Sequence, residues 1–210
     1  MLDYIVLPQN ELNSLPCDVA EDFEYIVLAM DDFDTQIDFE VAAKDFRELL
    51  AKAPESRLIK LYLGVALACA RHDDEALSIL QELTALHPDF LYAHAILMRL
   101  FLDMKDFAKV TKLIRDTIIP DNAPLDMLFS YYCTVAYCLN FMGLFPLARK
   151  YMDAAKRLDP KNKEYMKLYK DLEKDAADAK TIHKLICKMP QEKLKELVEA
   201  LIEQYGGEIE

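Results

Sequence analysis

The chain has 210 residues, a net charge of −12 and a hydrophobic content of 53%, which is ample for a folded core. No apolar run approaches the roughly 20 residues that a membrane-spanning helix needs, and a scarcity of glycine favours helices. The acidic excess lies at the N-terminal end, because residues 1–40 hold eleven Asp and Glu and no Lys or Arg. Such a surface repels phosphate backbones, so we expect no nucleic-acid partner. We interpret it as a solvated acidic face, with a landing site for a basic segment as the alternative.

Residues 1–22 are predicted to form an N-terminal arm. An apolar cluster opens it, at Leu2, Tyr4, Ile5, Val6 and Leu7. The cluster favours docking of the arm on the rest of the chain, within one subunit or in a dimer, although a disordered end is the alternative. Loop signals follow at Asn10, Asn13, Ser14 and Pro16. The start lacks the basic residues and long apolar stretch of a secretory signal, so we expect a cytoplasmic protein.

A repeat of about 34 residues follows the arm. A small residue recurs at Ala42, Ala76, Val110 and Ala148. A large apolar residue recurs in the same phase at Phe46, Leu80, Ile114 and Met152. Prolines agree with the period at Pro54, Pro88 and Pro160. The last step is four residues longer than the others, and we place the extra residues in a loop at 120–124.

This spacing, with Leu63-Gly64 ahead of Ala76, Leu80 and Pro88, resembles the tetratricopeptide repeat. The resemblance covers repeats at 23–56, 57–90, 91–124 and 129–162. It implies an all-α fold, a right-handed superhelical stack of helix hairpins, in which Gly64 lets a facing helix approach closely. The chain departs from the family pattern in having no Trp. The family's first aromatic position holds Ile26, Lys60, His94 and Tyr132, and Met98 replaces the glycine of the third repeat.

Helix boundaries are predicted from capping residues and apolar phase. In the first repeat, which begins near Phe23, a first helix runs through Ile26, Ala29, Met30 and Phe33. Asp38 is the expected N-cap of the second helix. Asp106 is the expected N-cap of the second helix in the third repeat. Residues 163–210 are predicted to form C-terminal capping helices, with one helix over 165–172 and another over 179–188.

A last helix is expected after Pro190. Its apolar stripe has a period near 3.6 and consists of Leu194, Leu197, Val198, Leu201, Ile202 and Tyr205. We interpret the stripe as core packing, with a dimerisation or partner helix as the alternative.

The first helices of such hairpins line a concave groove in this family, which makes the groove the candidate binding surface. The predicted groove residues are Asp31, Asp34, Leu58, Leu61, Tyr62, Val65, Tyr92, Ile96, Arg99, Tyr137 and Phe141, with Leu102 and Cys133 also facing inward. Members that bind a peptide's terminal carboxylate use Lys, Asn and Arg there. The matching positions here are Val27, Asp31, Tyr62, Tyr92 and Ile96, so that mechanism is not expected. An exposed apolar stripe suits an apolar segment of a partner, unless the chain's own arm or C-terminal helices cover it.

No catalytic or metal-binding motif is present, so we expect no enzyme, no cofactor and no metal. The five cysteines have no pattern, which favours reduced thiols over a zinc or redox site. They are Cys17, Cys69, Cys133, Cys138 and Cys187.

The sequence therefore predicts a protein–protein interaction scaffold or chaperone-like adaptor that binds an apolar, partly basic segment in the groove. The chain is also similar to the small acidic repeat chaperones of bacterial type III secretion, although it is longer and has one more repeat. The alternative is a self-assembling structural subunit, such as a homodimer, whose own N-terminal arm fills the groove.

Overall fold

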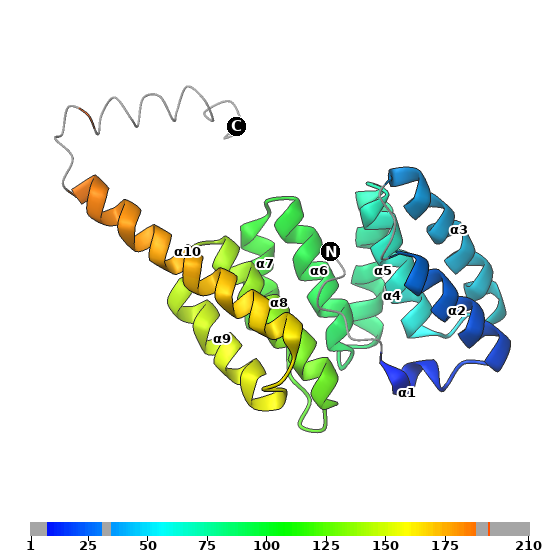
Figure 1. Cartoon of the computed structure of the whole chain (residues 1–210). Helices are drawn as coiled ribbons and strands as arrows, with labels where there is room; N and C mark the ends of the chain where they lie inside the picture. The colour runs from blue at the N-terminus through cyan, green and yellow to red at the C-terminus, as the bar shows by residue number, and fades with distance from the viewer. Residues whose placement is uncertain (1–7, 31–34, 188–192, 194–210) are drawn as a thin grey trace. The chain divides into compact units, whose positions relative to one another are not determined.

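The computed structural model describes residues 8–30, 35–187 and 193, and the regular elements of these residues are all α-helices. In chain order they are α1 (Gln9–Leu12), α2 (Cys17–Met30), α3 (Gln36–Lys52), α4 (Arg57–Cys69), α5 (Asp73–Leu86), α6 (Leu91–Asp103), α7 (Phe107–Asp116), α8 (Leu125–Phe141), α9 (Phe145–Leu158) and α10 (Lys163–Cys187). The prediction of an all-α fold is confirmed for this part of the chain (Figure 1). The chain divides into two compact units, residues 1–169 and 170–210, so α10 begins in the first and ends in the second.

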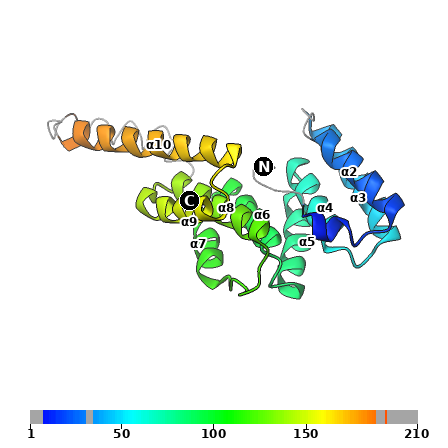
Figure 2. The same cartoon turned by 60° about the horizontal axis from the view of Figure 1, so that its bottom comes forward.

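Within the first unit, α2 to α9 form four antiparallel hairpins of consecutive helices (Figure 1). Helix α3 also contacts α4, and α5 contacts α6, so each of the first two hairpins packs against the next. The first helices lie beside one another, because α4 contacts α6 and α6 contacts α8 (Figure 2).

Helices α4 and α6 are surrounded on every side. Of the residues from Leu58 to Ala68, Lys60 alone is partly exposed, and every residue from Leu91 to Leu102 is buried. A helix that is apolar on all faces is stable only when neighbours cover all of them. These two helices are therefore the core about which the first unit is built.

An aromatic cluster joins the first hairpin to the second. The rings of Phe23 on α2 and Tyr62 on α4 meet edge to face with centroids 5.1 Å apart. Phe46 on α3 completes the cluster at 5.7 Å from Phe23 and 6.0 Å from Tyr62. Aromatic pairs at such distances contribute about 0.5–1.5 kcal/mol beyond the burial of their area. Tyr62 is thus a structural contact between hairpins.

Small residues permit the close approach of α4 and α5. A Cβ atom at Gly64 would lie 3.0 Å from Cγ and Cδ2 of Leu80, which is too close for an ordinary contact. The expectation that Gly64 faces the second helix of its hairpin is confirmed, with Leu80 as the residue that it meets.

The turns inside the second, third and fourth hairpins share one geometry. Each passes through a residue in the left-handed region, at Arg71 (φ 63°), Lys105 (φ 59°) and Gly143 (φ 74°). In the first of these turns the amide of His72 donates to the carbonyl of Leu67 at 2.9 Å, and the equivalent bond recurs in the other two. This is the Schellman motif, in which two amides after the helix satisfy its last carbonyls. The three turns follow the same spacing as the sequence repeat.

Two helix starts follow from side-chain caps. Asp106 caps α7 as predicted, because its carboxylate accepts the amide of Lys109 at 3.0 Å. The prediction for α3 was wrong by three residues. Thr35 is the N-cap and Asp38 is the third helical residue, and the two exchange hydrogen bonds as a capping box.

The N-terminal arm contains more helix than its loop signals indicated. Helix α1 occupies residues 9–12, and α2 begins at Cys17, six residues before the predicted first repeat at 23. Leu12 is buried, so the described part of the arm contributes to the core. The loop expected at 120–124 is present, and residues 117–124 lie between α7 and α8 without helix.

The prediction of separate helices at 165–172 and 179–188 was wrong. A single helix, α10, runs over Lys163–Cys187. No Gly or Pro occurs between these stretches, so nothing interrupts the helix. Residues 1–7, Asp31, Phe33, Asp34 and the stripe from Leu194 to Tyr205 lie outside the described residues.

The shared turn geometry predicts opposite effects of two substitutions. Arg71→Gly is expected to raise the free energy of unfolding by about 0.5–1 kcal/mol, because glycine adopts the left-handed region without a Cβ clash. Gly143→Ala is expected to lower it by about 1 kcal/mol through the backbone alone, since a Cβ there meets no atom within 4 Å. Urea denaturation measures both. A stabilising Gly143→Ala would contradict the turn assignment.

Candidate functional site

Most of the predicted groove residues are buried in the structure. The buried set comprises Leu58, Leu61, Tyr62, Val65, Tyr92 and Ile96, and the inward-facing Leu102 and Cys133 are buried with them. The long faces of α4 and α6 therefore offer no open groove to a partner, because both helices are covered on every side. Asp31 and Asp34, predicted to make one end of the groove acidic, lie outside the described residues.

Three predicted site residues, Arg99, Tyr137 and Phe141, lie together near the C-terminal ends of α6 and α8. The guanidinium carbon of Arg99 lies 3.9 Å from the centre of the Tyr137 ring, a cation–π contact. Arg99 is buried, and its Nε has no hydrogen-bond partner among the described residues. Phe141 follows one helical turn after Tyr137 and is 60% exposed.

An exposed apolar surface continues from Phe141 across the neighbouring turns. The ring of Phe107, 42% exposed, lies 6.4 Å from that of Phe141, although the two come from different hairpins. Met104 and Leu144 are exposed within three residues of these rings. We call Met104, Phe107, Tyr137, Phe141 and Leu144 the apolar edge. Sequence reasoning missed three of its members, because at a helix end an apolar residue is as easily taken for core.

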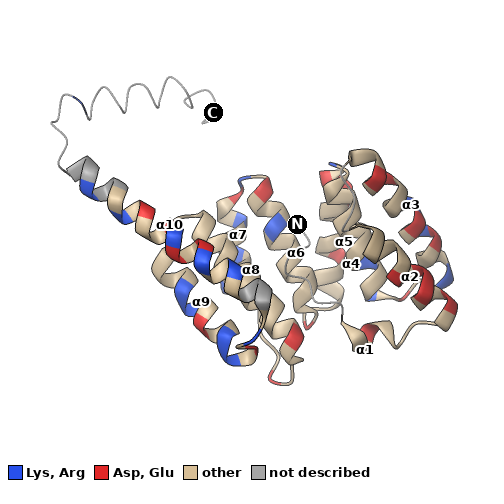
Figure 3. Ribbon diagram, viewed as in Figure 1, with Lys and Arg blue, Asp and Glu red and all other residues tan. Residues whose placement is uncertain are grey.

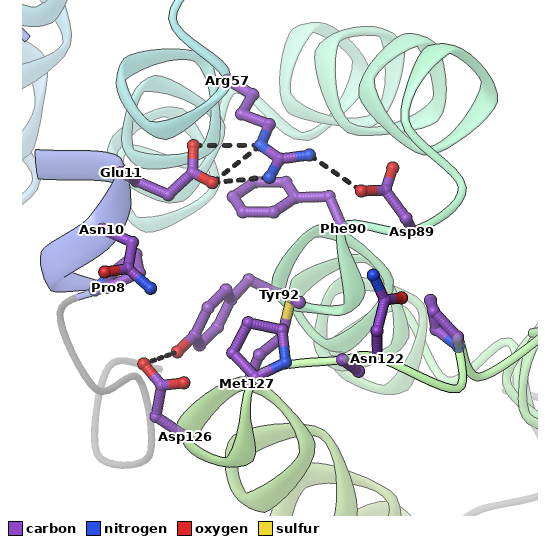
Figure 4. A pocket seen from close by; sticks show the side chains of 13 residues that line it. Pro8, Asn10, Glu11, Arg57, Asp89, Phe90, Tyr92, Asn122, Asp126 and Met127 are labelled. Carbon is purple, nitrogen blue, oxygen red and sulfur yellow. Dashed lines mark hydrogen bonds and ion pairs between the residues drawn. The ribbon is translucent and has the colours of Figure 1, made fainter. Parts of the chain in front are cut away.

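A cavity of about 240 Å³ lies at the other end of the same helices (Figure 4). The α5–α6 turn, the α7–α8 loop and the first turns of α1, α4, α6 and α8 surround it. Its lining consists of Pro8, Asn10, Glu11, Arg57, Asp89, Phe90, Tyr92, Pro120, Asn122, Ala123, Pro124, Asp126 and Met127. Tyr92 alone among these was a predicted site residue. The others are far apart in the sequence, and no motif joins them.

Arg57 holds one side of the cavity together. Its Nε donates to Oε2 of Glu11 at 2.9 Å, and its Nη1 donates to Oδ2 of Asp89 at 3.1 Å. The guanidinium also covers the ring of Phe90, with 4.6 Å between the cation and the ring centre. The hydrogen bonds that Arg57 donates to Glu11 raise the pKa of Arg57 above its ordinary value. One side chain thus joins α1, α4 and the α5–α6 turn.

Tyr92 and Asp126 form the opposite side of the cavity (Figure 4). The hydroxyl of Tyr92 donates to Oδ2 of Asp126 at 3.2 Å. Burial and then the charge of Asp126 raise the pKa of Tyr92, so the hydroxyl stays protonated and remains a donor. No Lys, Arg or His of the described residues makes an ion pair with Asp126, whereas Glu11 and Asp89 are both paired with Arg57. Three carboxylates therefore face one cation in this cavity.

Charge is distributed unevenly over the helices of the first unit (Figure 3). Helix α2 carries Asp18, Glu21, Asp22 and Glu24 and no basic residue. Helices α7 and α9 are predominantly basic, with seven Lys and Arg against two Asp. Helix α2 thus contributes four of the eleven acidic residues of the N-terminal end.

Cysteines and acidic groups supply no further site in the described residues. Four free cysteines are described, and Cys17 is exposed, Cys69 partly exposed, and Cys133 and Cys138 buried. Burial raises the pKa of Cys138 to about 12, which makes it a poor nucleophile. No three His, Cys, Asp or Glu side chains of the described part lie close enough together to hold a metal ion.

Comparison with protein-family models, curated proteins and solved structures finds no match to this chain. Among the residues that the structure describes, no helix combines the length and apolar character needed to cross a membrane.

The partly buried pair of Glu11 and Arg57 predicts a measurable contribution to stability. Glu11→Gln is expected to lower the free energy of unfolding by about 1–2 kcal/mol, because Arg57 loses a charged, two-pronged partner. The matched control is Glu75→Gln, since Glu75 pairs with Arg47 at a surface where both side chains are about half exposed. The control change should cost less than about 0.5 kcal/mol. Both free energies of unfolding are measured by urea denaturation. An equal loss in the two variants would show that the Glu11–Arg57 pair contributes no more than a surface ion pair.

Proposed function

We propose that this chain is a protein–protein interaction scaffold that binds an apolar, partly basic segment of another protein. The observation that carries the proposal is the apolar edge, where aromatic side chains from two hairpins touch each other and are still exposed. A contiguous apolar surface is costly in water and commonly marks a binding site. Phe107 and Phe141 provide large rings that a partner can cover, as the anchors of protein interfaces do.

A stack of tetratricopeptide-like hairpins is the architecture that we propose for the first unit. The proposal is supported by three turns of one geometry at Arg71, Lys105 and Gly143, which follow the spacing of the sequence repeat. The packing of Gly64 against Leu80 supports it as well. In such a stack, each hairpin needs its neighbours to bury its apolar face, and the turns at its edges display side chains to a partner.

The preference for a partly basic segment is supported by the charge of the chain. The net charge is −12, and residues 17–24 of α2 include four acidic residues and no basic one. Opposite charge on a partner would speed its association and make binding weaken with salt. An adaptor or chaperone-like role fits binding of this kind, because a few apolar anchors give affinity without a catalytic group.

The test of the proposal is selection from a displayed library of short random peptides. Peptides that bind the whole protein are expected to be enriched in apolar residues with at least one Lys or Arg, and to bind with a Kd on the order of micromolar. Absence of any enriched pattern would count against an interaction scaffold.

The apolar edge predicts a loss of peptide binding in one variant. The double change Phe107→Ser and Phe141→Ser should weaken the selected peptides at least about 10-fold, since burying each ring contributes on the order of 1.5–3 kcal/mol. The matched control is Tyr25→Ser with Leu28→Ser, two exposed apolar residues on α2, which should leave binding unchanged. Calorimetric titration measures both variants.

Two outcomes would contradict this assignment. Equal weakening by the control variant would mean that the selected peptides bind exposed apolar surface without preference. The second outcome is an average molar mass in light scattering that rises with protein concentration. If the Phe107/Phe141 variant abolished that rise, the apolar edge would be assigned to self-assembly instead.

A further inference from the structure

We propose that the cavity beside Arg57 binds the cationic end of a Lys or Arg side chain from a protein partner. The proposal rests on the proposed function, because it identifies where a partly basic segment would place its positive charge. The cavity is separate from the apolar edge, since it lies at the N-terminal ends of α6 and α8 while the edge lies at their C-terminal ends.

The charges around the cavity favour a cation. Arg57 is shared between Glu11 and Asp89, so its single positive charge is already outweighed by its own partners. Asp126 adds a third carboxylate, and none of the basic residues in the described part of the chain pairs with it. The first turns of α4, α6 and α8 contribute partial positive charge, about +0.5 at each helix end, which together with Arg57 stays below the charge of three carboxylates. An incoming carboxylate or phosphate would therefore be repelled, and an ammonium or guanidinium group attracted.

The geometry of Asp126 leaves it able to accept a ligand. Its Oδ2 accepts the Tyr92 hydroxyl at 3.2 Å, which fixes the orientation of the carboxylate. The other oxygen, Oδ1, takes part in no hydrogen bond with the described residues. Figure 4 shows the amides of Asn10 and Asn122 on the same cavity, and their carbonyl oxygens are further acceptors for N–H groups. A cation with several donors could thus be held by one carboxylate and two amides.

The size and walls of the cavity suit one long side chain. Its volume of about 240 Å³ is below the range of about 300–1,000 Å³ typical of sites for drug-sized ligands. The apolar part of the lining consists of Pro8, Phe90, Pro120, Ala123, Pro124 and Met127. The methylene stems of Lys and Arg bury well along such walls while the charged end finds its partners.

The length of α6 separates the cavity from the apolar edge. Helix α6 joins the two and has 13 residues, which corresponds to roughly 20 Å. About six residues of extended chain span that distance. A bound segment that reached both would therefore place its basic residue at least about six positions from its apolar anchor.

The test is a titration of the whole, isotope-labelled protein by nuclear magnetic resonance at low salt. The probes are Nα-acetyl-arginine amide and Nα-acetyl-lysine amide, with Nα-acetyl-citrulline amide as the neutral match to arginine. The two cationic probes are expected to shift the backbone signals of Asn10, Asn122 and Met127 with a Kd on the order of millimolar. Equal binding of the citrulline compound would overturn the proposal, and so would tighter binding of the free diamine cadaverine than of the lysine probe.

Three variants make the test specific to Asp126. Asp126→Asn should weaken both cationic probes at least fivefold, while Asp121→Asn, the same charge change in an exposed loop position outside the cavity, should not. Asn122→Asp adds a carboxylate to the lining and should tighten binding at least threefold, a gain that loss of folding cannot imitate. Unchanged affinity in Asp126→Asn and Asn122→Asp would overturn the proposal. These probes carry no apolar anchor. If they did not bind, the proposal for the cavity would fail, and the proposal that peptides bind at Phe107 and Phe141 would still stand.

Discussion

The apolar surface of α4 and α6 is the constraint on which the first unit depends. Helix α4 is in contact with α3, α5 and α6, and α6 is in contact with α4, α5, α7 and α8. Burial of a large apolar side chain stabilises a fold by about 1.5–3 kcal/mol, and most of the twenty-two buried residues of these two helices are apolar. A partner that used their long faces would have to displace this packing. Binding surfaces are therefore expected where the two helices end.

The two ends of these helices differ in chemistry because they are closed in different ways. At the C-terminal ends of α6 and α8, Schellman turns satisfy the backbone carbonyls without side chains, so the neighbouring positions are free to hold apolar residues. At the N-terminal ends of the same helices, no side chain caps the free amides, since the N-caps are Phe90 and Pro124. Carboxylates near those amides are favoured by the helix dipole. Asp89 and Asp126 lie there, and they make that end polar and acidic.

The periodicity of the sequence was sufficient to predict that the chain is helical and how its hairpins are spaced. The small residues in phase with Ala76, the close approach at Gly64 and the cap at Asp106 all follow from local rules. The burial of Tyr62 and Ile96 did not follow from the sequence, because an apolar residue on a first helix gives the same pattern whether it lines an open groove or is covered. The continuity of α10 was also missed, since the proposed break rested on apolar phase and on no Gly or Pro.

The cavity could not have been found from the sequence for a different reason. Glu11 and Arg57 are 46 residues apart in the sequence, and Tyr92 and Asp126 are 34 apart. The step from the third repeat to the fourth is 38 residues, so Tyr92 and Asp126 are not equivalent positions of the repeat. The sequence periodicity therefore did not predict that these two residues meet.

Tyr92 shows why the core and the cavity are linked. Its ring lies 5.7 Å from that of Phe90 and is buried with α6, while its hydroxyl reaches Asp126. Tyrosine suits such a boundary because it has an apolar body and a polar tip. The buried ring cannot move without disturbing α6, so the hydroxyl and the carboxylate that it orients are held by the packing of the core. The rigid part of the unit thus positions Asp126 before any ligand arrives, which lowers the ordering cost of binding.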